Sequence, residues 1–107
     1  MPLIRIEFDD AKVSTKEVGA LSKSVRDIVS SITAIDDVFV YANTAQIKFQ
    51  IAPIEIFVQM TAKKITDEDA LVAQIKEKLS NWKKEVGFGH PINLTLMPMN
   101  WKVEIAI

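Results

Sequence analysis

The chain has no cysteine and a single histidine, His90, among its 107 residues. Without cysteine there is no disulfide, no thiolate chemistry and no cysteine-based metal site. One histidine, with no second ligand at a metal-binding spacing, also argues against zinc. This histidine follows Gly89 and precedes Pro91, which is typical of an ordinary loop residue. We therefore expect neither a metal nor another cofactor.

Long apolar runs and an excess of one charge are missing as well. No apolar stretch is long enough to span a bilayer, and a net charge of −1 gives no general attraction to nucleic acid or anionic membranes. The first residues alternate and carry Arg5, Glu7 and Asp9, unlike a signal peptide. We expect a cytoplasmic protein without a nucleic-acid or membrane partner, and the length predicts one domain over residues 1–107.

The first half of the sequence is patterned as strand, helix, strand, strand. Residues 2–9 alternate between apolar and polar side chains, which predicts a half-buried strand. Ser14 and Glu17 have the spacing of a capping box, so a helix is expected to begin there. Its apolar stripe consists of Val18, Leu21, Val25, Ile28, Val29 and Ile32. A second strand is expected over residues 38–41 and a short third strand over residues 47–51.

The second half repeats this order. Residues 54–60 alternate, a polar cap at 66–69 precedes a second helix, and Gly87 ends it. The second apolar stripe consists of Val72, Ile75, Leu79, Trp82 and Val86. Further strands are expected at 92–96 and 101–105. When the halves are aligned, Ile28 falls on Trp82, so both side chains are expected to be buried against the sheet.

The two halves, residues 2–53 and 54–107, are therefore predicted to be a duplicated β-α-β unit. Right-handed crossovers place each helix over a parallel strand pair. We predict an α+β fold with a four-stranded mixed sheet, two helices on one face and a short additional strand after each unit. The other sheet face would carry a mixture of apolar and polar side chains, including Arg5, Tyr41 and Phe57. That mixture predicts a subunit interface.

The Met-Pro start, the duplicated β-α-β unit and the short strand after each unit resemble the tautomerase superfamily. That group includes 4-oxalocrotonate tautomerase, 5-carboxymethyl-2-hydroxymuconate isomerase and macrophage migration inhibitory factor. Segments 53–58 and 94–99 look most like a branch of small uncharacterised tautomerase-like proteins. The resemblance covers essentially the whole chain and rests on architecture plus Pro2. It implies a homotrimer with active sites near subunit borders and an N-terminal proline, here Pro2, as the catalytic base.

The resemblance also implies substrate-binding residues. In 4-oxalocrotonate tautomerase an arginine ten positions after the catalytic proline binds a substrate carboxylate, and the matching position here is Lys12. A second arginine of that enzyme has no counterpart in residues 38–41, and a lysine of the inhibitory-factor branch has none in residues 34–36. A solvated loop lysine is the alternative interpretation of Lys12.

Four further residues are candidates for the same substrate pocket. Phe39 and Tyr41 could form a wall of it, although aromatic residues in strands commonly serve packing. Asn100 could donate a hydrogen bond to a substrate carbonyl. Trp101 stands beside it but matches Ile47 in the repeat, which favours a core or interface role.

Pro2 can act as a base only if Met1 is removed, because a retained Met1 turns its nitrogen into an amide. The free amine could take a proton α to a carbonyl of a small keto or enol acid and return it at another carbon. Pro2 is otherwise a strand-starting proline. Three functions stay open: a tautomerase, a catalytically silent trimer of the same fold, and a ferredoxin-like ligand-binding module, whose element order is also βαββαβ. The two additional strands argue against the third.

Overall fold

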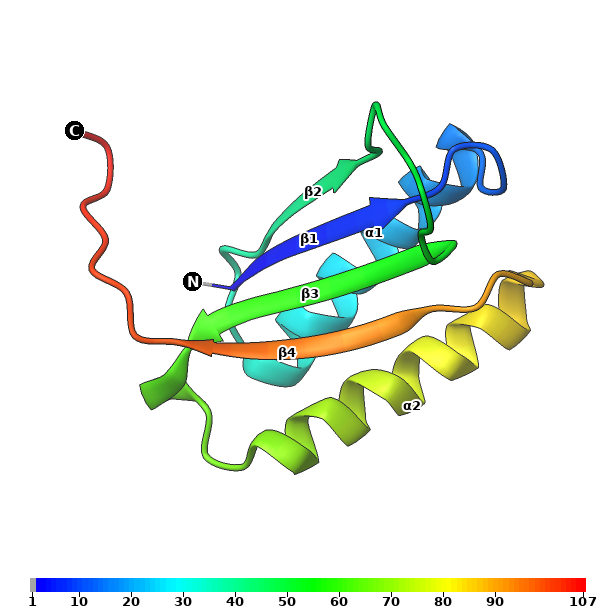
Figure 1. Cartoon of the computed structure of the whole chain (residues 1–107). Coiled ribbons are helices and arrows are strands. Elements are labelled where there is room, and N and C mark those ends of the chain that lie inside the picture. The colour runs from blue at the N-terminus through cyan, green and yellow to red at the C-terminus, as the bar shows by residue number, and fades with distance from the viewer. Residues whose placement is uncertain (1) are drawn as a thin grey trace.

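Four strands and two long helices make up the part of the chain that the structure, a computed structural model, describes: residues 2–107. The elements are, in order, β1 (Leu3–Phe8), α1 (Thr15–Thr33), β2 (Phe39–Asn43), β3 (Ile54–Thr61), the 3₁₀ turn η1 (Ala62–Lys64), α2 (Glu68–Val86) and β4 (Asn93–Met99). Both helices cover the same face of one sheet (Figure 1). The predicted order of helices and of these four strands is thus confirmed.

The sheet has the strand order β2-β1-β3-β4. β1 runs parallel to β2, with Leu3 opposite Phe39, and antiparallel to β3, with Leu3 opposite Gln59. β3 in turn runs parallel to β4. The predicted α+β class with a four-stranded mixed sheet is therefore confirmed. Because β1 and β2 are direct neighbours, this order differs from the ferredoxin-like fold, in which another strand splits the parallel pair.

Local sequence signals set the helix ends. Ser14 Oγ accepts a hydrogen bond from the Glu17 N–H over 3.1 Å, and the Glu17 carboxylate accepts one from the Ser14 N–H over 3.0 Å. Asp67 caps α2 by accepting from the Ala70 N–H over 3.0 Å. Gly87 follows α2 with a φ of 70°, a left-handed conformation that glycine adopts without strain. Within the described range, neither helix is long and apolar enough to cross a membrane.

The core lies between the helices and the sheet face that they cover. β1 and β3 bury alternate residues, among them Ile4, Ile6, Ile56 and Val58, which have no exposed surface. The helices contribute buried residues at helical spacing: Val18, Leu21, Val25 and Val29 from α1, and Leu71, Ile75 and Leu79 from α2. The side chains that the strands bury at every second residue and those that the helices bury at every third or fourth residue therefore form one apolar layer.

Three details of the predicted core are wrong. The buried stripe of α2 begins with Leu71 rather than Val72, and Val86, its predicted last member, is 57% exposed. Trp82 and Ile28 pack against the core but are only partly buried, because they also line a groove between α1 and α2. There the Trp82 ring packs against Phe88 with 5.2 Å between centroids. The two helices approach each other at this point, so a side chain at this position meets the neighbouring helix.

Neither of the short additional strands forms in the chain that the structure describes. Residues 47–51 lie in the loop between β2 and β3, and residues 101–105 lie in the tail after β4. Ile47 is 91% exposed and Phe49 is fully exposed. A strand needs a partner for its backbone hydrogen bonds, and both segments extend away from the sheet (Figure 1). Their alternating pattern is that of a strand, but within one chain they find no partner.

The sheet face away from the helices carries the mixed set of side chains that the sequence predicts. Phe39 is 45% and Tyr41 55% exposed. The Arg5 guanidinium carbon lies 5.1 Å from the centre of the Phe57 ring and is stacked over it. This open face is thus partly aromatic. The loop after β2 borders it near Phe57, and no helix or strand of the described chain covers it.

Candidate functional site

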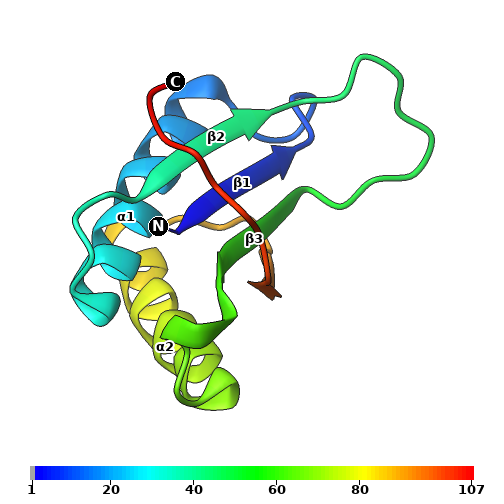
Figure 2. The same cartoon turned by 90° about the vertical axis from the view of Figure 1, so that its left-hand side faces the viewer.

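One end of the sheet gathers parts of both halves of the chain. β1 and β2 are parallel and both begin there, whereas β3 and β4 both end there. The end of α1, the turn η1 and the start of α2 lie along the same edge (Figure 2). We call this end of the sheet the Pro2 end, because Pro2 directly precedes β1.

Pro2 is enclosed by its neighbours, with less than 2% of its surface exposed. Its carbonyl accepts a hydrogen bond from the Phe39 N–H over 3.2 Å, which ties the start of β1 to β2. The register that sets Leu3 opposite Gln59 continues to place Pro2 beside Met60, which is also buried. The pyrrolidine ring is thus buried at the end of the sheet where β1 begins.

A cavity of 430 Å³ opens next to Met60 at the Pro2 end, between the end of α1 and the start of α2. Its wall is mixed: Ile32, Ile35 and Ile65 are apolar, whereas Thr33, Thr66 and Gln74 are polar. Lys64, at the end of η1, also lines it. Its volume lies in the range of small-molecule sites, so a small organic acid would fit. The sequence pattern did not single out Lys64 as a residue that lines a cavity.

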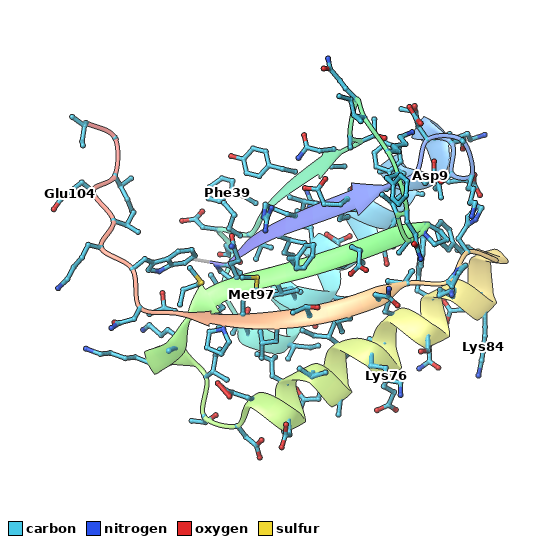
Figure 3. The ribbon with its side chains drawn as sticks, viewed as in Figure 1. Asp9, Phe39, Lys76, Lys84, Met97 and Glu104 are labelled. Carbon is cyan, nitrogen blue, oxygen red and sulfur yellow. The ribbon has the colours of Figure 1, made fainter. Side chains whose placement is uncertain are left out.

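Lys12 lies at the opposite end of β1 from Pro2. The six residues of β1 separate the two, about 20 Å of extended backbone. Asp9 shapes this distant loop: its carboxylate accepts from the Ala11 N–H and its carbonyl from the Lys12 N–H, both over 3.0 Å. Figure 3 shows Asp9 at the far end of the sheet from Phe39. Within one chain, the structure does not bring Lys12 to Pro2.

A second lysine that sequence reasoning missed, Lys48, reaches the Asp9 loop. Its ammonium contacts the carboxylate of Asp10 and lies 3.5 Å from that of Asp9. The hydrogen bond to Asp10 is the largest of the effects that raise the pKa of Lys48. The contact links the loop after β2 to the loop after β1. Sequence spacing could not predict it, because the partners are far apart in the chain.

The two aromatic candidates of β2 are placed differently. Phe39 lies opposite Leu3 and makes the backbone contact with Pro2, so it belongs to the Pro2 end. Tyr41 lies two residues farther along, opposite Arg5 in the middle of β1. Both side chains stand on the open face, and Phe39 is the one adjacent to Pro2.

Asn100 and Trp101 follow β4 directly and therefore also lie at the Pro2 end. The Asn100 side chain is exposed, whereas Trp101 is partly buried. The indole Nε1 of Trp101 donates a hydrogen bond to Oγ1 of Thr61, the last residue of β3, over 3.0 Å. Of the six residues that the sequence proposed, the structure thus gathers Pro2, Phe39, Asn100 and Trp101 at one end and leaves Tyr41 and Lys12 elsewhere.

A polar cluster at the other end of the molecule ties α1 to the loop after α2. His90 Nε2 lies 2.7 Å from Glu17 Oε2, and Lys83 Nζ donates to the His90 carbonyl over 2.6 Å. The backbone hydrogen bond from Ser14, followed by that from His90, lowers the pKa of Glu17. Within residues 2–107, no three histidine, aspartate or glutamate side chains are grouped so as to hold a metal ion.

Neither a protein-family model nor a curated protein matches the sequence. Solved structures do match the fold. A fused 4-OT in an asymmetric trimer superposes with a TM-score of 0.65 at 10% identity, over 94% of this chain and 91% of the other. A 5-carboxymethyl-2-hydroxymuconate delta-isomerase gives 0.62 at 13% identity, over 99% and 89%.

A third structure, of Pt0534 inactivated by 2-oxo-3-pentynoate, gives a TM-score of 0.61 at 14% identity, over 99% of this chain and 93% of the other. Proteins of unknown function from Vibrio cholerae and Sebaldella termitidis match as well. All of these identities are low, so the agreement concerns the path of the backbone. On that agreement, this chain has the fold of the tautomerase superfamily.

Proposed function

We propose that the protein is a tautomerase that acts on a small keto or enol acid, with the amine of Pro2 as general base once Met1 has been removed. The observation that carries this proposal is the position of Pro2. It directly precedes β1 with less than 2% of its surface exposed, and the removal of Met1 would make its nitrogen a secondary amine. The tautomerase fold, shared with an isomerase and with 4-OT, supports the same reaction class.

The chemistry follows from the surroundings of that amine. An ordinary α-amine has a pKa of about 8, and the secondary amine of proline is more basic. Burial disfavours the protonated form and therefore lowers the pKa, as a nearby cation would also do. A base whose pKa is close to the working pH is the most effective. The neutral nitrogen takes the proton from the carbon α to a carbonyl, and the resulting ammonium returns it at the other carbon of the enol system.

A homotrimer completes the proposal. The open sheet face is partly aromatic and uncovered, with Phe39 and Tyr41 about half exposed, which is unusual for a face that meets only water. Residues 47–51 and 101–105 have strand patterns without partners in the chain. Pairing with a neighbouring copy would supply partners for both, and one structure of this fold is a trimer.

The assembly also bears on Lys12. Because Lys12 and Pro2 lie at opposite ends of β1, Lys12 can contribute only to the site of a neighbouring copy. In that role it would bind a substrate carboxylate. This is a consequence of the strand length and is tested separately below.

The second candidate function is a catalytically silent trimer. It is favoured by residues 38–41, which hold no arginine, and by the separation of Lys12 from Pro2. In that case the burial of the Pro2 ring serves only to start β1. A retained Met1, which makes the Pro2 nitrogen an amide, would be sufficient for this outcome, and a processed protein without activity would lead to it as well.

The test begins with the intact mass of the purified protein, which establishes whether Met1 is absent. The protein is then incubated with 2-oxo-3-pentynoate, the compound that inactivates Pt0534. The Pro2 nitrogen should bond to the alkyne carbon that bears the methyl group, β to the ketone, while its proton is lost and a proton adds to the alkyne carbon next to the ketone. Peptide mapping should place one label per chain on Pro2.

A matched control carries one lysine inserted between Met1 and Pro2, so that the Pro2 nitrogen stays an amide. The form without Met1 should ketonise phenylenolpyruvate, followed by the loss of its ultraviolet absorbance, and the control should not. Equal labelling and equal rates in the two forms would show that Pro2 is not the base. A fully processed protein that neither labels nor turns over an enol acid would favour the silent trimer.

A further inference from the structure

The loop after β2, residues 44–53, is held to its own chain at only a few points. It extends beyond the sheet between β2 and β3 (Figure 2). In the described residues, the one backbone–backbone hydrogen bond that this loop makes runs from the Asp9 N–H to the Pro53 carbonyl, at the end of the loop, over 3.0 Å. The position of the rest of the loop therefore depends on side-chain contacts.

Lys48 makes such a contact from the middle of the loop. Its ammonium binds the carboxylate of Asp10 and lies 3.5 Å from that of Asp9. Asp9 is buried, and its carboxylate also accepts from the Ala11 N–H over 3.0 Å, so this partner has a fixed position. Among the ion pairs of residues 2–107, Lys48 is the one basic partner of Asp9. We call the contacts of Lys48 with Asp9 and Asp10 the Lys48 clasp.

The clasp leaves the two neighbours of Lys48 on the solvent side. The side chain of Lys48 is 25% exposed, whereas Ile47 is 91% and Phe49 fully exposed. Neither apolar side chain thus gains from burial within its own chain. Large apolar side chains that stand together in water commonly mark a surface that another molecule covers.

The clasped loop continues the open face of the sheet. A cavity of 400 Å³ lies between them, lined by Gln50 and Ile51 from the loop and by Glu55 and Phe57 from β3. The exposed apolar residues of the loop therefore border the face that carries the aromatic side chains. Because that face is the subunit interface of the proposed function, on which this inference rests, the occupant to expect is a second copy of this chain.

We propose that Lys48 is a positioning residue for assembly: the clasp holds the loop in place so that Ile47 and Phe49 meet a second copy of the chain. The two apolar side chains supply contact area, while Lys48 stays paired within its own chain. Without the clasp, the loop has to be ordered when the chains associate, and the entropy lost in that step weakens binding.

The experiment follows assembly and needs no substrate. Sedimentation velocity over a dilution series, with fluorescence detection, measures the concentration at which half of the chains are assembled. Lys48→Met should raise this concentration about tenfold or more, the loss expected when a charge-assisted hydrogen bond no longer orders the loop. Lys48→Arg should retain most of the assembly. Lys76→Met, the same change at an exposed position of α2 (Figure 3), should assemble as the wild type does.

Two double variants test whether Lys48 acts through these contacts. Asp10→Asn should weaken assembly nearly as much as Lys48→Met, and the two together should cost little more, because both remove the same contact. Phe49→Ser should also weaken assembly, and Lys48→Met should then add less than it does in the wild type, because the ring that the clasp positions is gone. Equal effects of Lys48→Met and Lys76→Met, or fully additive losses in both double variants, would overturn the proposal.

The failure of this inference can be told apart from the failure of the proposed catalysis. If assembly depends on Lys48 while a protein without Met1 neither labels nor turns over an enol acid, the clasp stands and the catalytic proposal fails. If Pro2 is labelled and the wild type is a trimer, but Lys48→Met assembles at an unchanged concentration, the clasp has no part in assembly. A monomeric wild type would overturn both the trimer and this inference, and the labelling of Pro2 would still decide the base. Circular dichroism checks that each variant is folded.

Discussion

The indole of Trp101 donates a hydrogen bond to the hydroxyl of Thr61 over 3.0 Å, and this contact anchors the tail to the Pro2 end of the sheet. Thr61 is the last residue of β3, and Trp101 is the second residue after β4. Together with Val103 and Ile105, the two residues line a shallow pocket. Beyond it the tail extends past the sheet, where Figure 3 labels Glu104.

We predict that Trp101→Phe releases this tail, because phenylalanine keeps an aromatic ring but has no N–H to donate. A part-buried hydrogen bond of this kind is worth about 1 kcal/mol. Amide hydrogen exchange of residues 101–107 should accelerate while exchange in β1 and β3 stays unchanged. Thr61→Val, which removes the acceptor, should have the same effect. Unchanged tail exchange in both variants would show that the contact does not hold the tail.

Phe57→Asp should disrupt the assembly that we propose. Phe57 stands on the open face, where Arg5 is stacked over its ring, so an aspartate there would place a charge within the proposed interface. Light scattering should show a trimer for the wild type and smaller species for the variant, with similar circular dichroism. Ala73→Asp, which adds the same charge at an exposed position of α2, is the control. A wild-type monomer at micromolar concentration would contradict the trimer.

The loss of stability caused by a core substitution should depend on how deeply the side chain is buried and not on its size. Ile56 has no exposed surface, so Ile56→Ala should cost about 2–5 kcal/mol of the free energy of unfolding. Trp82 is only partly buried and packs on Phe88 beside the groove between the helices. Trp82→Ala should therefore cost less, about 1–2 kcal/mol. Urea unfolding measures both, and a larger loss for Trp82→Ala would show that the groove is closed in solution.

Periodicity and caps predicted most of the fold. The alternation of β1 and β3 and the stripe of α1 place Ile4, Ile56 and Leu21 in the core without further information. The hydrophobic pattern alone gave a wrong prediction where the formation of a strand depends on a neighbouring strand. Residues 47–51 and 101–105 have the alternation of strands, but a strand exists only beside a partner, and sequence periodicity does not say whether that partner belongs to the same chain.

The candidate site was predictable only in part for a similar reason. Pro2 stands out in the sequence because of its amine, and its position at the start of a strand could be read directly. Thr61 and Lys64 lie at the Pro2 end because β3 runs antiparallel to β1, which depends on how the two halves of the chain pair. Lys12 was suggested by resemblance, and the length of β1 places it at the far end of the same chain.

The contribution of Glu17 to the stability of the fold should disappear in acid. Hydrogen bonds, first from the Ser14 backbone and then from His90, lower the pKa of Glu17 below its ordinary value of 4.5. A carboxyl with a lower pKa in the folded state stabilises the fold above its unfolded pKa, and this contribution disappears as the pH falls through the folded value. Glu17→Gln should thus reduce the free energy of unfolding near neutral pH but not in strong acid. The same difference at both pH values would contradict this linkage.

Replacement of the proposed base should slow catalysis without removing the site. Pro2→Ala leaves a primary amine that is less basic and more flexible, so kcat for phenylenolpyruvate should fall while KM changes little. The intact mass must first show that Met1 is absent from both proteins. A variant as fast as the wild type would show that the rigid secondary amine is not needed for the reaction.

Mixed assemblies test whether Lys12 serves the Pro2 of a neighbouring copy. Lys12 and Pro2 lie at opposite ends of β1, so a shared site needs two chains. Pro2→Ala mixed with Lys12→Ala should then regain activity, because some sites combine an intact Pro2 with an intact Lys12. The mixture is unfolded and refolded together, and its rate is compared with those of the separate variants. A mixture no faster than the mean of the two variants would show that Lys12 does not contribute to a neighbouring site.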